Sequence, residues 1–182
     1  ETADPCVSRR KKRLQGIVFS CLIAFLLLFL LFPKKKSFEI DFLDVGQGDC
    51  IYLCTGGGTS MFIDGGSTDV KQVGKYRILP FLKAKGVSEI SYWFVSHTDT
   101  DHVSGLKEVL VSGYRVEYLV FAKAVEKEAK TKELAELARS HGTKVFYMQA
   151  GDTVRSKRAA MRCLYPKASD KAEDVNDLCL VL

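Results

Sequence analysis

Residues 16–32 contain no charged side chain and are almost entirely apolar, which leaves few structures open to this part of the chain. At about 1.5 Å per residue, a helix over residues 14–33 spans about 30 Å, the thickness of the hydrocarbon core of a bilayer. A signal peptide is the alternative, but its apolar region is about 7–15 residues long and ends at small residues. Here the run ends in Phe-Pro-Lys-Lys-Lys. The sequence therefore predicts one transmembrane helix over residues 14–33.

Positive charge gathers on both sides of this apolar run. Residues 9–13 carry five basic side chains and residues 34–36 carry three. The larger charge before the run predicts that residues 1–13 form a basic cytoplasmic flank at a cell membrane and that the following domain is extracytoplasmic. Without residues 1–37, which hold eight of the 27 basic and two of the 22 acidic residues, the chain is nearly neutral. Net charge therefore gives no support for DNA binding by the domain, although residues 155–158 leave a local basic groove open.

The chain from residue 38 onward alternates between short apolar strands and helices. Glycine turns join the first three strands, and helices separate the later ones. The expected strands are residues 38–43, 50–54, 61–63, 91–96, 116–122, 145–148, 161–165 and 178 onward, and the expected helices are residues 78–85, 105–110 and 125–140. Helices mixed with strands predict a layered α/β domain.

Two imidazoles and two carboxylates, His97, Asp99, Asp101 and His102, follow directly after the strand expected at residues 91–96. Such nitrogen and oxygen ligands suit zinc, manganese or iron. A polar loop is the alternative, but four such groups within six residues are denser than solvation requires. We expect the first three to alternate along an extended loop, with His102 starting the next turn. Two adjacent metal ions, or one ion with outer partners, then fit better than a single tetrahedral centre.

Four further polar residues lie in glycine turns. Asp64 precedes two glycines, and it can either accept the second N–H of a metal-binding histidine or simply form the turn. Asp44, Gln47 and Asp49 belong to another glycine-rich turn, whose backbone can line a pocket, although a turn role is favoured on sequence alone. His141 is expected to interact with the C-terminal end of a helix.

Three ordered motifs resemble the metallo-β-lactamase fold. Residues 96–105 are similar to its metal-binding signature, with Asp99 in place of the second histidine. Residues 42–49 and 62–66 resemble, more narrowly, the C-terminal domain of ComEC-type proteins, the DNA-internalisation channel proteins of bacterial competence. The resemblance covers about residues 38–182. It implies an α/β fold, the αββα sandwich, of which this chain holds about the first half after its predicted transmembrane helix.

The resemblance also implies a metal-dependent hydrolase that cleaves the phosphodiester bonds of the non-transported DNA strand. Its divalent ions, two zinc or manganese ions, would be held by His97, Asp99, Asp101 and His102, with Asp101 also acting in catalysis. Asp64 would lie behind these ligands. The implied partners are DNA, bound without sequence preference, the lipid bilayer, the rest of a polytopic channel and other competence proteins.

In this fold a later aspartate and at least one later histidine complete the site, beyond a strand that resembles residues 176–182. We therefore expect a fragment, truncated at its C-terminus, that binds metal weakly and does not turn over by itself. Two alternatives stay open. One is a stand-alone single-pass hydrolase of another phosphodiester or ester, and the other is a non-catalytic DNA-uptake module.

Overall fold

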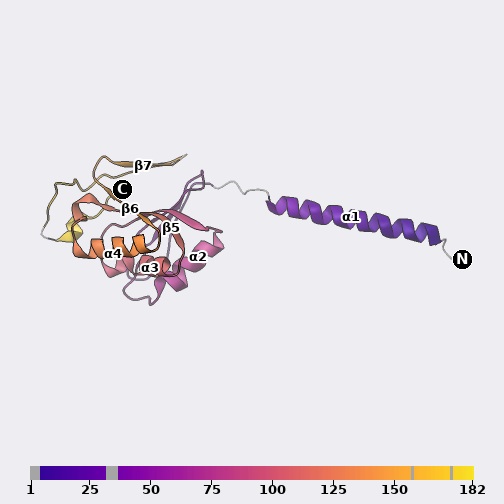
Figure 1. Cartoon of the computed structure of the whole chain (residues 1–182), viewed down its shortest axis with the longest axis horizontal. Coiled ribbons are helices and arrows are strands. Elements are labelled where there is room, and N and C mark those ends of the chain that lie inside the picture. The colour runs from indigo at the N-terminus through magenta and orange to yellow at the C-terminus, as the bar shows by residue number, and fades with distance from the viewer. Residues whose placement is uncertain (1–4, 32–36, 157, 173) are drawn as a thin grey trace. The chain divides into compact units, whose positions relative to one another are not determined.

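The apolar run folds as a helix, α1 (Pro5–Leu31), in a computed structural model that describes residues 5–31, 37–156, 158–172 and 174–182. The helix belongs to a unit of its own, residues 1–35 (Figure 1). Large apolar side chains of residues 14–29 are exposed on it. Within the described ranges, however, no helix is both long and apolar enough to cross a membrane. The transmembrane helix predicted over residues 14–33 is therefore not supported, and its last two residues lie outside the described part.

The second unit, residues 36–182, is built on a mixed six-stranded sheet in the order β1-β2-β3-β4-β5-β6. The first three strands are antiparallel neighbours because short turns join them, and β3, β4, β5 and β6 are parallel because helices connect them. The strands are β1 (Glu39–Phe42), β2 (Ile51–Cys54), β3 (Ser60–Ile63), β4 (Glu89–Phe94), β5 (Arg115–Ala122) and β6 (Lys144–Met148). The α/β domain predicted from the sequence is confirmed.

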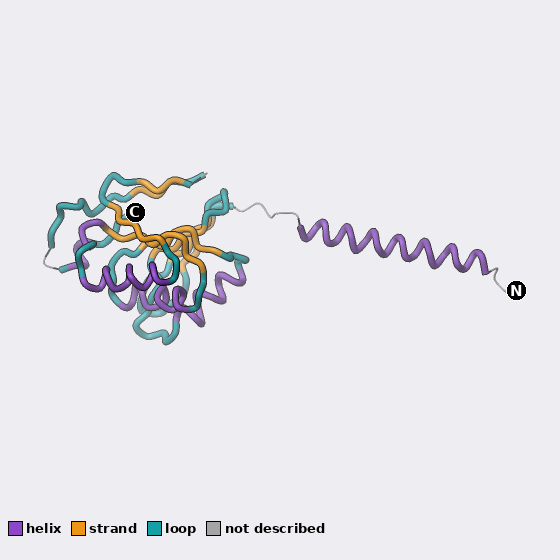
Figure 2. Tube along the Cα trace, viewed as in Figure 1, coloured by secondary structure: helices purple, strands orange, loops and turns teal. Residues whose placement is uncertain are grey.

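Three helices cover one face of this sheet (Figures 1 and 2). They are α2 (Leu79–Ala84), which a π-helical turn at Gly74–Ile78 precedes, α3 (Thr100–Val111) and α4 (Ala129–Ser140). Their apolar side chains bury the main core together with the sheet, in which the rings of Phe62 and Trp93 stack with centroids 4.6 Å apart. This core packs β3, β4 and α3 against one another. The polar residues of the site lie in the loops that follow β3 and β4 and at the start of α3.

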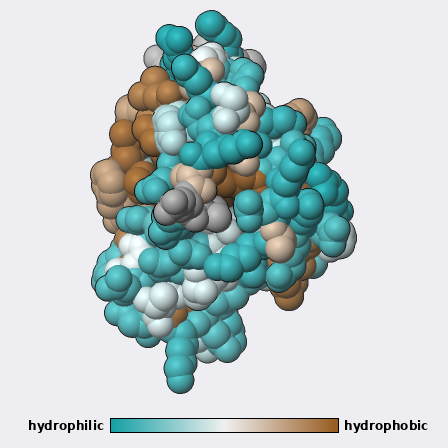
Figure 3. Space-filling view, turned by 90° about the vertical axis from the view of Figure 1, so that its left-hand side faces the viewer, coloured by the Kyte–Doolittle hydropathy of each residue, from teal (hydrophilic) through white to brown (hydrophobic). Residues whose placement is uncertain are grey.

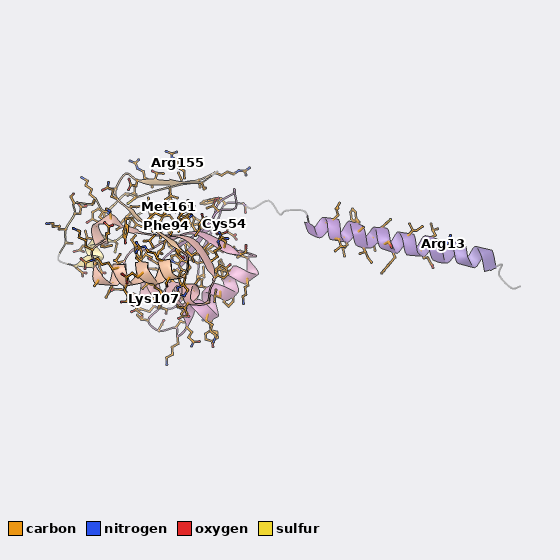
Figure 4. All side chains as sticks on the ribbon, in the orientation of Figure 1. Arg13, Cys54, Phe94, Lys107, Arg155 and Met161 are labelled. Carbon is orange, nitrogen blue, oxygen red and sulfur yellow. The ribbon has the colours of Figure 1, made fainter. Side chains whose placement is uncertain are left out.

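The opposite face of the sheet carries a short hairpin, β7 (Thr153–Arg155) and β8 (Ala160–Arg162). Figure 4 shows Phe94 and Met161 on this side and Lys107 on the helix side. A cavity of about 390 Å³ lies between the hairpin and the sheet, and aromatic side chains of β4, β5 and β6 line it. In Figure 3 apolar side chains gather along one edge of a largely hydrophilic face.

Two expectations about the elements are wrong, and one strand was not expected. The strand expected from residue 178 is a 3₁₀ turn (Val175–Leu178), followed by an isolated bridge between Tyr165 and Val181. The hairpin strand β7 was not among the expected strands, because its three residues are too short to show a pattern. The helix expected at residue 105 begins five residues earlier, at Thr100, which changes the geometry of the candidate ligands.

Candidate metal centre

The candidate site lies where the parallel strands β3 and β4 end side by side. Ile63 pairs with Phe94, and the Asp64 N–H then donates to the Phe94 carbonyl at 2.9 Å. The chain continues from β4 through Ser96 to His97 and enters α3 at Thr100. Carboxyl ends of neighbouring parallel strands meet at one edge of a sheet, so residues more than 30 positions apart come together here.

Three of the four predicted ligands form one group. One ligand atom each from His97, Asp101 and His102 lies within 4.8 Å of the other two. The imidazole centroids are 3.8 Å apart, and His102 Nε2 is 3.6 Å from Asp101 Oδ2. Both imidazoles are largely buried, with 13% of the His97 side chain and 12% of the His102 side chain exposed. These donors can surround one divalent cation.

Asp64 contacts His102 at Nδ1, the ring nitrogen that faces away from Asp101. Its carboxylate accepts hydrogen bonds from the Ser96 N–H at 2.8 Å, the Ser96 hydroxyl at 2.5 Å and His102 Nδ1 at 2.9 Å. Because a carboxylate only accepts, His102 Nδ1 carries the proton and the lone pair of Nε2 faces Asp101. Of the two roles left open by the sequence, the geometry presents both, because the carboxylate contacts a histidine and the backbone has a turn-like positive φ of 54°. Asp49, Asp64 and His102 also form a three-residue group, but the hydrogen bond already occupies His102 Nδ1.

His97 has the same tautomer for a different reason. The Ser96 hydroxyl donates its proton to Asp64, so the contact of 3.1 Å between Ser96 Oγ and His97 Nδ1 requires Nδ1 to donate. Cys179 Sγ lies 3.5 Å from the same nitrogen. His97 Nε2 is left with a free lone pair, 3.9 Å from Asp99 Oδ2. In both histidines Nδ1 is thus engaged by protein atoms and Nε2 faces a carboxylate of the motif.

The two imidazoles differ in how their surroundings shift their pKa. Burial and the neighbouring His102 lower the pKa of His97, so it stays neutral, which is the form that binds a metal. For His102, burial acts against the charged form, but the hydrogen bond to Asp64 and the carboxylates of Asp64, Asp101 and Asp49 outweigh it and raise the pKa.

The expectation that Asp101 follows Asp99 along an extended loop is wrong. Asp99 has an extended backbone, and its carbonyl already accepts from the N–H groups of His102 and Val103, so the helix starts directly after it. Asp101 and His102 therefore both project from the first turn of α3. The Asp99 carboxylate lies outside the three-residue group and accepts from Lys130 Nζ at 2.9 Å. This hydrogen bond lowers the pKa of Asp99.

Of the three polar residues in the first glycine turn, only Asp49 reaches the group, with Oδ2 at 3.8 Å from His102 Nδ1. Asp44 is exposed and accepts from the Gly46 N–H at 3.3 Å, a turn role. The Gln47 N–H donates to Asp69 Oδ1 at 2.8 Å. These contacts of Asp44 and Gln47 are turn contacts, and they give no support to the pocket role considered for the two residues. His141 contacts the Leu137 carbonyl at the end of α4, as expected.

Sequence reasoning missed three residues at the site. Ser96 immediately precedes His97, and a hydroxyl beside two histidines was a signal that could have been used. Lys130 and Cys179 lie 31 and 82 residues from their partners, Asp99 and His97. No local pattern announces such distant contacts. Cys179 and Cys163 are both free thiols.

Residues 43–160 match the model of the metallo-beta-lactamase superfamily, and the chain belongs to this family. It is 29% identical over 175 residues to ComE operon protein 3 of Bacillus subtilis (strain 168). The matched region covers 89% of this chain and 22% of that protein. It is also 29% identical over 104 residues to Recombination protein 2 of Haemophilus influenzae, covering 57% and 13% of the two chains. The resemblance to ComEC-type proteins is confirmed, and the chain spans less than a quarter of the length of these relatives.

Metallo-beta-lactamases are among the solved structures to which the chain is similar. One is a HARLDQ-motif mutant from Cronobacter sakazakii, with 15% identity and a TM-score of 0.47, covering 69% of this chain and 50% of that one. Another, from Hirschia baltica, has 15% identity and a TM-score of 0.36, covering 66% and 57%.

Replacing Asp64 by asparagine is expected to weaken binding of a divalent ion about tenfold, within the range for the loss of an outer partner of a metal-binding histidine. An amide accepts fewer hydrogen bonds than a carboxylate and no longer fixes the His102 tautomer. Competition with a chromophoric chelator measures the affinity. Asp152→Asn is the matched control, because among the described residues only the Gln149 N–H donates to this carboxylate. Equal affinities of the two variants would contradict the assigned contact.

Proposed function

We propose that this chain is part of a metal-dependent hydrolase that acts on phosphodiester bonds of DNA during DNA uptake by competent bacteria. One observation supports it most. His97 and His102 each have Nδ1 engaged by protein atoms and Nε2 directed at a carboxylate. Second hydrogen bonds of this kind hold metal-binding histidines in orientation.

The donor set fits a divalent ion of borderline character. Two imidazole nitrogens and a carboxylate oxygen, from His97, His102 and Asp101, suit zinc or manganese, and three protein ligands leave a position open for water or substrate. Asp99 Oδ2 lies 3.9 Å from His97 Nε2 and Asp49 Oδ2 lies 3.8 Å from His102 Nδ1, so each would add a carboxylate at one side of the group. A bound ion would polarise a phosphoryl oxygen. It would also lower the pKa of a coordinated water molecule to about 7.

The protein's own residues would supply orientation and proton transfer. Asp101 lies beside His102 Nε2, and 30% of its side chain is exposed, so it can accept a proton from an attacking water molecule. Asp64 is 3% exposed and fixes the imidazole of His102. The group is open to solvent at Asp49 and Asp99, whose side chains are 65% and 40% exposed.

DNA as the substrate, competence proteins as partners and the non-transported strand as the target rest on the resemblance to ComEC-type proteins. So does an extracytoplasmic domain at a cell membrane, since no described helix qualifies as a span. The αββα sandwich belongs to the same proposal, in which a second sheet would cover the face that carries β7 and β8. Because the domain is nearly neutral, its attraction for phosphate should come from the bound ion.

Fluorescence anisotropy of a single-stranded oligonucleotide tests this proposal. The 182-residue chain is expected to bind the oligonucleotide in the presence of Mn²⁺. Addition of a chelator should release the oligonucleotide. A chain with both His97→Asn and His102→Asn should bind the oligonucleotide equally weakly with Mn²⁺ and after addition of the chelator. Binding that is unaffected by the chelator, or an absence of Mn²⁺ binding by equilibrium dialysis, would refute the proposed site.

A further inference from the structure

Lys130 lies outside the segment that carries the candidate ligands, yet it contacts one of them. Its Nζ is 2.9 Å from Asp99 Oδ1, and α4 brings it there from 31 residues away. Among the described residues, Lys130 provides the one ion pair that joins a lysine or arginine to a carboxylate of the His97 to His102 motif. Of the carboxylates in this motif, Asp99 is therefore the one with a cationic partner outside it.

The orientation of the Asp99 side chain is not the one expected at the start of a helix. An aspartate at this position usually turns its carboxylate back onto the free N–H groups of the first turn. Asp99 is the residue before α3 and has the extended backbone of such a cap, with φ −74° and ψ 157°, but its side chain makes no capping hydrogen bond. The carboxylate is directed at Lys130 instead.

The two oxygens of Asp99 face different neighbours, and the Asn176 side chain also lies against this carboxylate. Oδ1 accepts from Lys130, while Oδ2 lies 3.9 Å from His97 Nε2. This separation is too long for a hydrogen bond. It is short enough for both atoms to bind one ion, because zinc ligands lie about 2.0–2.2 Å from the metal. Lys130 thus occupies one oxygen and leaves the other facing the histidine.

Stability of the fold does not account for this contact. The side chain of Lys130 is 69% exposed and that of Asp99 is 40% exposed, and ion pairs on the surface add little to folding stability. Lys130 also lies in the first turn of α4, where the helix dipole disfavours a positive charge. A residue that breaks a local rule without a local gain points to a role in the site.

From these contacts we infer that Lys130 is a positioning residue, which holds the Asp99 carboxylate so that one oxygen faces His97 Nε2 and can share an ion with it. The purpose of this positioning rests on the proposed metal site. The geometry itself, the direction of the Asp99 side chain, does not depend on a metal and is tested separately below.

Three variants of the full chain separate positioning from charge. Lys130→Met removes the ammonium and keeps the length of the side chain, and Lys130→Arg keeps a cationic donor. Lys107→Met is the matched control, because Lys107 lines the same cavity of about 240 Å³ as Lys130 and pairs with Glu133 of α4 at 3.6 Å. Figure 4 shows Lys107 on the helix side of the sheet. The chain is purified in detergent because α1 exposes apolar side chains.

Two measurements are made on each variant. Chelator competition with Co²⁺ gives the affinity, and the visible spectrum of bound Co²⁺ reports the ligand geometry. Crystal structures without metal give the direction of the Asp99 carboxylate. In Lys130→Met we expect affinity about tenfold weaker, a changed spectrum and a carboxylate turned onto the free N–H groups of α3. Lys130→Arg should largely restore all three, and Lys107→Met should match the parent chain.

An Asp99 carboxylate that stays in place in Lys130→Met would overturn the inference, whatever the affinity. So would a loss of affinity as large in Lys107→Met, because charge alone would then explain the effect. A parent chain that binds no metal would refute the proposed function, and the direction of Asp99 in the two Lys130 variants would still decide the role of Lys130.

Discussion

A chain carrying His102→Asn is expected to bind divalent ions at least about 100-fold more weakly than the parent chain, while its stability changes little. Removing a ligand costs more than the 10–100-fold that the loss of an outer partner costs. The amide nitrogen of asparagine takes the place of Nδ1 and can still donate to Asp64, which now accepts from His102 at 2.9 Å. Only Nε2, the atom that faces Asp101, is lost. Equilibrium dialysis measures the affinity, and thermal unfolding measures the stability.

His102→Gln is the complementary variant, because glutamine reaches toward the position of Nε2 but gives up the contact with Asp64. It should lower the free energy of unfolding by about 1–3 kcal/mol, since it leaves a buried acceptor with one partner fewer. The third histidine of the chain, His141, hydrogen-bonds within the described residues only to Leu137 and Ser140 at the end of α4, so His141→Asn controls for a general effect. Unchanged metal binding in His102→Asn would show that Nε2 is not a ligand.

Gly66→Ala is expected to lower the free energy of unfolding by about 3 kcal/mol, the upper part of the usual cost of overpacking, and to disrupt metal binding as well. A Cβ at this position would lie 2.5 Å from the Thr100 carbonyl oxygen and 2.6 Å from the His102 backbone nitrogen. These are backbone atoms at the start of α3, which cannot rotate away. The helix turn that carries Asp101 and His102 would have to shift. Urea denaturation and chelator competition on the same preparation measure both effects.

Gly86→Ala provides the control for the loss of a glycine as such. Gly86 has a positive φ of 63° and open space around its Cβ position, so its substitution should cost about 1–2 kcal/mol of backbone strain and leave metal binding unchanged. If Gly66→Ala bound metal as well as Gly86→Ala does, the close approach of the two loops would not determine the position of the ligands.

The order of strands and helices could be predicted because each strand is a short apolar run between glycine turns or amphipathic helices. β4 is an example, since the run that ends at residue 96 in the sequence corresponds to a strand at Glu89–Phe94. The start of α3 was misjudged because Asp101 was interpreted as a ligand in an extended loop, whereas the helix already begins at Thr100. Asp99 is a good residue for the position before a helix, and this signal was not used.

The candidate site was predicted as far as it is local in the sequence. His97, Asp101 and His102 lie within six residues, and the structure brings them together. The role of Asp64 could not be decided from the sequence, because its contact with His102 depends on the parallel pairing of β3 with β4. Lys130 was not predictable at all, since its position beside Asp99 depends on how α4 packs against α3.

Three glycines let main chain pass directly against main chain around the site. A Cβ on Gly48 would lie 2.5 Å from the Asp101 carbonyl oxygen, one on Gly66 would meet the start of α3, and one on Gly105 would lie 2.6 Å from the Gly65 carbonyl oxygen. The close approach of the loops that carry the ligands therefore depends on these glycines. Protein engineers could exchange the ligand side chains on these loops, for example Asp99 for histidine, and so alter the choice of metal without rebuilding the scaffold.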